Sequence, residues 1–305
     1  MTTPTHAQTK ALGLTAFLTL LLIAFMMGSN HVAARLAFND GLDVATAVAV
    51  RSFATAIAVT LMVVWGGLAW RTHAKQRRGL LLVGLLIGAQ SQLLYGAVSR
   101  LPVALALIAF NTFPIWTALW DFVIYKKRPN KVVLKALPIL LLGLFLALDV
   151  LGAASGLGAS AHTALIGVGV AFGLAAAAVF GLSLVVMQHE TIGVDGRVRT
   201  AATLSLAGIV ALSVMGAQGG PHWPHSSLGW AALVTLTLLY GTAFTIMFTV
   251  LPKLGVGNNA AIMNAEPVFA LIMAWLVLGQ TIAASQIAGA LLVVGTVIWL
   301  GLRKR

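Results

Sequence analysis

Ionisable side chains within long apolar runs are the residues of this sequence best suited to bind a polar solute. Glu266 lies about ten residues into one such run and directly precedes Pro267. Because proline lacks an amide donor, it weakens a helix locally and leaves a carbonyl free to contact a solute. A carboxylate at that depth predicts a binding site for a cationic group or a proton. The alternative is a structural glutamate that one partner satisfies or that desolvation keeps neutral.

Histidine and arginine side chains in the first two apolar runs are the next candidates. Arg51 lies about eight residues into the second run, so it either pairs with an acid in helix packing or binds a substrate carboxylate. His31 either titrates during function or is a hydrogen-bonded structural residue. Arg35, one turn further along, is expected to extend to the membrane interface. Asp121, near the end of its run, is expected to be an interface residue or a local ion-pair partner.

Aromatic and amide side chains add a third set of candidates. Tyr95 belongs to a polar series at i, i+4 and i+8, Tyr240 begins an aromatic series of the same spacing, and Trp116 belongs to a tryptophan stripe. Such residues either pack in the core or form a cavity wall that stacks on aromatic or cationic solutes. Asn111 and Asn264 either bridge helices or contact substrate.

The runs that carry these residues have the length of membrane-spanning helices. The chain is 60% apolar and 9% charged, whereas a soluble domain has roughly 25% charged residues. A spanning helix needs about 20 apolar residues, and continuous apolar runs exclude the alternating pattern of a β-barrel. The fold class is therefore all-α, a polytopic membrane protein of ten transmembrane helices. The predicted spans are 12–38, 43–68, 79–99, 103–125, 131–150, 164–187, 199–216, 228–250, 256–278 and 282–302.

The basic residues are distributed unequally between the two sets of loops. Nearly all of the 19 lysines and arginines lie in the two tails and in alternate loops. The positive-inside rule then predicts that both termini are cytoplasmic, in a multi-pass protein of a bacterial-type inner membrane. The net charge of +12 thus reflects topology and not nucleic-acid binding. The first run is expected to be retained as a span, not cleaved as a signal peptide.

The second half of the sequence repeats the first at a constant offset. Asn111 and Pro114 recur as Asn264 and Pro267, and the same offset takes Val32 to Val185. We therefore predict two domains, 1–150 and 151–305, each a five-helix repeat. Because five is odd, the repeats enter the membrane from opposite sides, as in many secondary transporters.

The residues of these repeats resemble a known family. The segment from Asn264 to Gln280 resembles the ninth-helix signature of the drug/metabolite transporter superfamily, EamA type, and 289–295 resembles its tenth helix. Residues 101–127 resemble the first-half copy of that signature, and 28–30 the first-helix motif. The resemblance implies two EamA-like units, at about 10–150 and 163–303, in an exporter of amino acids, drugs or other metabolites. The aromatic amino acid exporters are the group it is most similar to.

One departure from the family pattern bears on mechanism. Lys127 and Gln280 stand where the family frequently has glutamate after the fourth and ninth helices. A mechanism that requires acids at these two positions is therefore in doubt for this chain.

These patterns favour transport over catalysis. The sequence has no cysteine, no Walker A motif and no HExxH motif, so we expect no cofactor, no metal and no enzyme activity. The expected partners are a small-molecule substrate and the lipid bilayer, without nucleic acid, and a monomer suffices. We predict an exporter of amino acids or similar amphipathic metabolites that works by alternating access through a central cavity. A channel or an importer of similar solutes, a membrane-embedded enzyme and a scaffold stay as alternatives. The predicted substrate-binding residues are Glu266, Asn264, Asn111, His31, Arg51, Tyr95, Trp116 and Tyr240.

Overall fold

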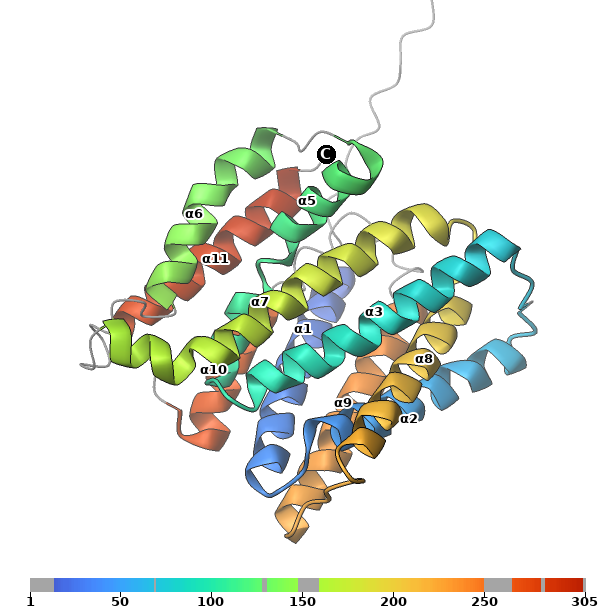
Figure 1. The fold of residues 1–305 in the computed structure, drawn as a ribbon, viewed down its shortest axis with the longest axis horizontal. Helices are drawn as coiled ribbons and strands as arrows, with labels where there is room; N and C mark the ends of the chain where they lie inside the picture. The colour runs from blue at the N-terminus through green and yellow to red at the C-terminus, as the bar shows by residue number, and fades with distance from the viewer. Residues whose placement is uncertain are drawn as a thin grey trace, which may run out of the picture.

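The described part of the chain is entirely helical, as the sequence predicts. The structure, a computed structural model, describes residues 14–68, 70–127, 131–147, 159–249, 265–280 and 283–303. Within these ranges it contains helices and no strand (Figure 1). The helices are α1 (Leu14–Asn39), α2 (Val44–Trp65), α3 (Ala74–Val98), α4 (Val103–Phe110), α5 (Phe113–Tyr125), α6 (Lys131–Ala147), α7 (Ala159–Glu190), α8 (Gly196–Ala217), α9 (Ser227–Thr249), α10 (Glu266–Leu278) and α11 (Ala284–Arg303).

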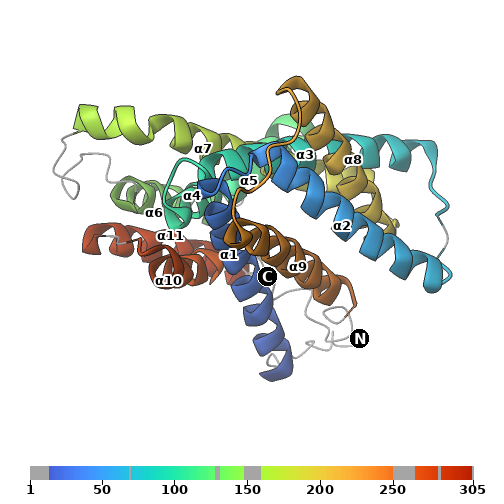
Figure 2. The same ribbon diagram turned by 90° about the horizontal axis from the view of Figure 1, so that it is seen from below.

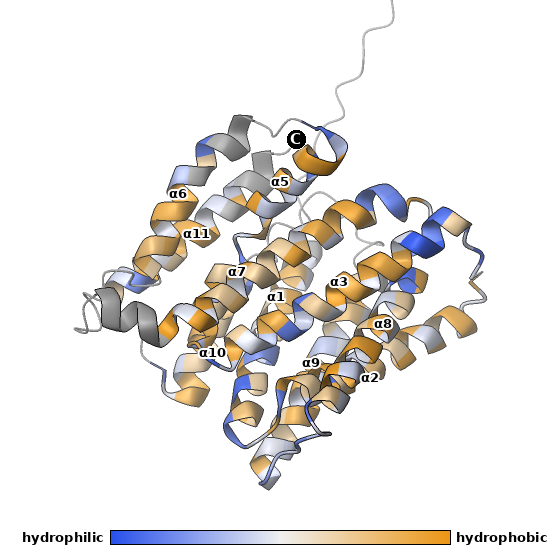
Figure 3. Ribbon diagram, in the orientation of Figure 1, coloured by the Kyte–Doolittle hydropathy of each residue, from blue (hydrophilic) through white to orange (hydrophobic). Residues whose placement is uncertain are grey.

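Seven described segments are long and apolar enough to cross a membrane. Six of them lie in single helices, and the seventh, Val103–Tyr125, combines α4 and α5. Three shorter apolar helices, in α6, α10 and α11, fall in other predicted spans. Hydrophobic residues cover most of the helix surfaces, and hydrophilic residues gather at helix ends and in loops (Figure 3). The membrane-protein class is thereby supported, while the number of ten spans remains a prediction.

The span 103–125 is interrupted at Asn111 and Thr112. Pro114, in the first turn of α5, cannot donate to the carbonyl one turn earlier, so the helix from α4 does not continue. Side chains satisfy carbonyls at the end of α4: Asn111 Nδ2 donates to the Leu107 carbonyl (2.8 Å) and Thr112 Oγ1 to the Ala109 carbonyl (2.8 Å). The sequence predicted one continuous helix here, and the break is a consequence of proline that the span assignment did not use.

The two halves of the chain pack in equivalent ways. α1 packs on α9 as α7 packs on α3, and α1 packs on α10 as α7 packs on α5. α2 packs on α8, and α6 packs on α11, which lie side by side at one edge of the molecule (Figures 1 and 2). α5 and α10 both end at a residue with positive φ, Lys126 (56°) and Gly279 (62°), which are repeat equivalents. This exchange of equivalent helices is the pattern that a two-fold related pair of repeats produces.

The centre of the fold is packed with small and aliphatic residues. Val32, Ala97, Leu107, Ala176 and Ala270, from five different helices, belong to one buried cluster. Close approach depends on glycine at the α1–α10 contact, where a Cβ on Gly28 would lie 2.8 Å from the carbonyl oxygen of residue 266. A Cβ on Gly181 would likewise lie 2.7 Å from the amide nitrogen of Thr117 at the α7–α5 contact. Both contacts are therefore nearly backbone to backbone.

The loop between α1 and α2 is tied to the loop between α8 and α9. The amide of His222 donates to Asp43 Oδ2 (2.9 Å), and Asp43 also caps α2 by accepting from the amide of Thr46. The amide of Ser226 donates to Asp40 Oδ2 (2.7 Å), and this bond holds the pKa of the Asp40 carboxyl below its ordinary value. Because that folded-state pKa is lowered, the contact persists above the ordinary aspartate range and weakens only as pH falls through the lowered value.

Candidate functional site

The centre of the candidate site is an ion pair between the two predicted residues His31 and Glu266. His31 Nε2 lies 3.1 Å from Glu266 Oε1, and their side chains are 3% and 21% exposed. His31 lies on α1, and Glu266 is the first residue of α10, where a negative charge is favourable beside free amide groups. The pair therefore joins helices from the two predicted repeats.

Tyr95 of α3 supports this pair from the side. The tyrosine is fully buried, its hydroxyl donates to Asn30 Oδ1 (3.1 Å), and its ring meets the His31 ring edge to face at 5.6 Å. Since both Asn30 and His31 lie on α1, one tyrosine fixes α3 against the polar face of α1.

Arg51 of α2 lies over the ring of the same tyrosine. Its guanidinium carbon is 4.1 Å from the ring centroid of Tyr95 and 4.2 Å from that of Tyr240, on α9. The side chain is 3% exposed, and within the described part of the chain no carboxylate lies in ion-pair range of it. Two aromatic faces thus hold the cation, and no described carboxylate neutralises it.

Several buried polar atoms of α1, α2 and α3 have no hydrogen-bond partner among the described residues. A buried polar group costs free energy unless it is paired. Three of these atoms, Asn30 Nδ2, His31 Nδ1 and Arg51 Nε, belong to residues that contact Tyr95. The others are Ser29 Oγ, Arg35 Nε, Ser52 Oγ and Gln92 Nε2.

Two other predicted site residues, Asn111 and Trp116, lie elsewhere. Asn111 is buried at the break between α4 and α5, where its amide bonds to a carbonyl of its own helix. Trp116 lies on α5, with its Cβ against Gly181 of α7. Neither shows a hydrogen bond or ion pair to His31 or Glu266 in the ranges that the structure describes, and Asn264 lies outside those ranges.

The Arg35 side chain, expected to extend to the membrane interface, binds carbonyls at the end of α3. Its guanidinium Nη1 donates to the carbonyl of Val98 (2.8 Å) and approaches that of Leu101 (3.5 Å). Val98 is the last residue of α3 and Leu101 follows it, so Arg35 satisfies acceptors at a helix end.

The predicted site residues did not include Asn30 and Ser52, which the structure shows to be buried. The available signal was their position beside the candidates: Asn30 is adjacent to His31, and Ser52 to Arg51. In an apolar run, a polar residue next to an ionisable one shares its depth in the membrane.

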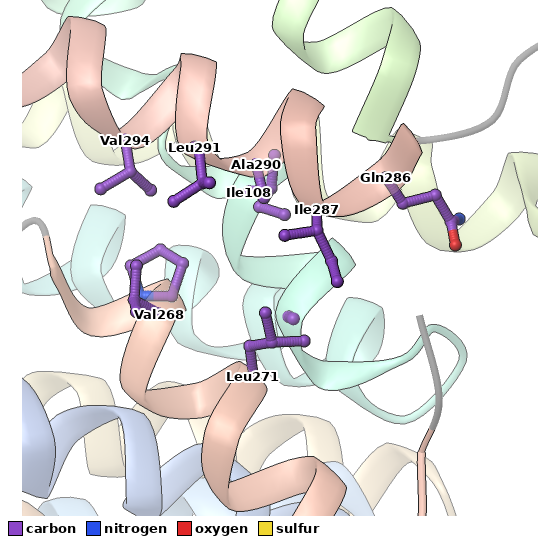
Figure 4. A pocket seen from close by; sticks show the side chains of 10 residues that line it. Ile108, Val268, Leu271, Gln286, Ile287, Ala290, Leu291 and Val294 are labelled. Carbon is purple, nitrogen blue, oxygen red and sulfur yellow. The ribbon is translucent and has the colours of Figure 1, made fainter. Parts of the chain in front are cut away.

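A pocket between α4, α10 and α11 is unsuited to a polar solute. Its volume is about 30 Å³, and aliphatic side chains of α10 and α11 face one another across it (Figure 4). Typical ligand sites hold roughly 300 Å³ or more. The pocket is lined by Ala104, Ile108, Pro267, Val268, Leu271, Gln286, Ile287, Ala290, Leu291 and Val294.

Comparison with known proteins gives the family-level match. The model of the EamA-like transporter family matches two segments of the chain, residues 14–148 and 167–302. These segments together contain the residues of the site, on α1, α2, α3, α9 and α10.

Curated relatives and a solved structure agree with this match. The threonine/homoserine exporter RhtA of Salmonella typhimurium strain LT2 is 28% identical over 231 residues, covering 72% of this chain and 70% of that protein. RhtA of Escherichia coli K12 is 27% identical over 237 residues, covering 75% and 72%. A crystal structure with a TM-score of 0.58 and 18% identity covers 93% of this chain and 95% of its own, which shows a shared fold.

Proposed function

The chain belongs to the EamA-like transporter family, and from this premise we propose that it exports a small polar amino acid by alternating access. The family is one of transporters, so the finer questions are which solute binds and how it crosses. The relatives printed as threonine/homoserine exporters support an amino acid with a short polar side chain. We therefore place small polar amino acids ahead of the aromatic ones that the sequence suggested.

The observation that carries this proposal is that Arg51, with no described carboxylate in ion-pair range, shares the ring of Tyr95 with the His31–Glu266 pair. Arg51 and His31 contact the same ring, that of Tyr95, and His31 contacts Glu266. An amino acid presents a carboxylate and an ammonium on one carbon atom. In the proposed complex the carboxylate binds the edge of Arg51, and the ammonium binds Glu266 in place of the imidazole.

Alternating access follows from the paired contacts of the two halves. We propose that residues 1–150 and 151–305 are inverted five-helix repeats, with both termini cytoplasmic in an inner membrane. The α1–α10 and α7–α5 contacts are then equivalent gates that open on opposite sides of the membrane. One chain holds both repeats, so a monomer suffices for this cycle.

Flux measurements in proteoliposomes test the proposal. Purified protein should exchange labelled threonine or homoserine, and unlabelled solute on the far side should accelerate this exchange. A channel does not show such acceleration, because its conduction needs no alternation between two conformations. Gradients imposed in each direction separate export from import.

The Glu266→Gln variant tests the role of the carboxylate, because glutamine has nearly the same shape without the charge. It should lower affinity for the amino acid and change the pH dependence of flux, while protein yield stays the same. Asp195→Asn serves as the control, because Asp195 caps α8 at a distance from the site and asparagine caps equally well. Flux of the Glu266→Gln variant that matches the parent at every pH would remove Glu266 from the proposed site.

A further inference from the structure

A second cluster of charged and aromatic side chains lies where α5 and α7 end and α3 begins. His189 Nε2 is 3.0 Å from Asp121 Oδ1, and the ring of Tyr125 stacks on that of His189 at 3.8 Å. The Tyr125 hydroxyl donates to Glu190 Oε1 (2.8 Å), and Lys75 Nζ lies 3.4 Å from Glu190 Oε2. Lys127 Nζ, 3.8 Å from Asp121 Oδ2, completes the chain of contacts.

These contacts connect the two predicted repeats. α3 and α5 belong to the first repeat and α7 to the second. Further into the protein, α5 and α7 are also joined by a hydrogen bond from Trp120 Nε1 to the carbonyl of Ala178 (2.9 Å). Gly181 then allows α7 to approach the backbone of α5. The polar cluster therefore lies at the outer end of the continuous contact between α5 and α7.

The equivalent contact in the other half has apolar residues at these positions. The repeat offset takes Asp121, His189, Tyr125 and Glu190 to Ala274, Leu36, Leu278 and Ala37, respectively. Ala274 and Ala37 are 1% and 0% exposed. Beyond the His31–Glu266 pair, the α1–α10 contact is thus formed by hydrocarbon, whereas the α5–α7 contact ends in ion pairs. The hydrophilic end of α7 is visible in Figure 3.

We propose that Asp121, Tyr125, His189 and Glu190 form a latch that holds the α5–α7 gate closed on the side of the basic loops. The inference rests on the proposed transport function, in which this gate and the α1–α10 gate open in turn. Separating α5 from α7 breaks the Asp121–His189 contact and the hydrogen bond from Tyr125 to Glu190. The latch residues are positioning residues, since they hold two helices together and lie outside the solute site.

The absence of cysteine from the sequence makes a direct test available. Val185 lies one turn before His189 on α7 and is 0% exposed, and its repeat equivalent Val32 on α1 is 2% exposed. Single reporters Val185→Cys and Val32→Cys are labelled with a membrane-impermeant maleimide, added to inside-out or right-side-out vesicles. The labelling rate then measures how often each gate opens.

Asp121→Asn should raise the labelling rate of Val185→Cys about tenfold from the cytoplasmic face, since charge-assisted hydrogen bonds are worth about that factor or more. Tyr125→Phe keeps the stacked ring and removes one hydrogen bond, so it should raise the rate about threefold. The rate at Val32→Cys should not rise in either variant. The double exchange Asp121→His with His189→Asp should restore protection, because it restores opposite partners at the same two positions.

Asp195→Asn is the control for loss of an ion pair at the same end of the protein. Asp195 pairs with Arg197 at the start of α8, and no second repeat is involved. It should leave both reporters unchanged. Unchanged labelling of Val185→Cys in Asp121→Asn, or an equal rise at both reporters, would overturn the latch.

The labelling assay needs no solute, so it can refute the latch without testing the proposed substrate. A protein that shows the latch pattern but does not exchange threonine refutes the proposed substrate alone. A protein that exchanges threonine with unaltered labelling in the latch variants refutes the latch alone.

Discussion

Replacement of Arg51 by methionine distinguishes a solute-binding arginine from a structural one. Methionine retains an unbranched apolar chain between the rings of Tyr95 and Tyr240 but removes the charge. Loss of charge-assisted hydrogen bonds to a substrate carboxylate costs about 1.5–3 kcal/mol. At about 1.4 kcal/mol for each factor of ten, the half-saturating concentration of the amino acid should rise about 10- to 100-fold.

Arg51→Met should not lower the stability of the protein, whereas loss of one partner of a structural ion pair would lower it. The variant loses two cation–π contacts, worth about 0.5–2 kcal/mol each. It also removes a buried charge that has no carboxylate in range among the described residues, and desolvating such a charge costs several kcal/mol. We therefore expect Arg51→Met to melt in detergent at the parent temperature or above it.

Arg35→Met provides the matched control on α1. Arg35 donates to the carbonyl of Val98, the last residue of α3, so its loss leaves a partly buried acceptor unsatisfied. That variant should be destabilised by about 1–3 kcal/mol, with unaltered affinity in the protein that remains folded. Threonine exchange in proteoliposomes gives the half-saturating concentration, and thermal unfolding gives the stability. If Arg51→Met unfolds as Arg35→Met does and its folded fraction keeps the parent affinity, the assignment of Arg51 to the substrate carboxylate is wrong.

Two further substitutions test the packing of the site. Gly28→Ala should lower the stability of the protein by about 1–3 kcal/mol, because its Cβ would lie 2.8 Å from a backbone oxygen of α10. Gly295→Ala, where nothing lies within 4 Å, should be neutral or stabilising in the same thermal assay. Tyr95→Phe removes the 3.1 Å hydrogen bond to Asn30 but keeps both ring contacts. It should weaken solute exchange about three- to tenfold, and an unaltered half-saturating concentration would show that this bond does not position the site.

Much of the fold could be predicted from the sequence because lipid imposes simple rules. A spanning helix must be apolar over about 20 residues, so apolar runs predicted most helices to within a few residues. The repeat offset also predicted that Phe113 and Glu266 would be equivalent, and each is the first residue of a helix, α5 and α10. In both halves a helix therefore begins at the residue directly before the repeated proline.

The partners of the buried polar residues could not be predicted in the same way. His31 and Glu266 meet because α1 packs on α10, and periodicity within a run does not state which runs are neighbours. The same limit applies to Arg35, whose acceptors lie on α3. Depth in the membrane follows from sequence position, whereas the direction of a side chain depends on the rotation and tilt of each helix, which packing determines.

A latch on only one of two equivalent gates would change the ratio of the two conformations of the carrier. If the two gates are equivalent in backbone and differ in side chains, the ion pairs of Asp121 and Glu190 favour the conformation closed on their side. A bias of about 1.4 kcal/mol changes the ratio of the two conformations tenfold. Such a bias alters the half-saturating concentrations measured from the two sides of the membrane. It cannot set the direction of net transport, because a carrier that only relaxes between two states follows the gradient of its solute or of a coupled ion. In the proposed cycle, net export therefore has to come from the gradient of the amino acid or of an ion coupled to it, and the proposed latch sets which side the resting carrier faces.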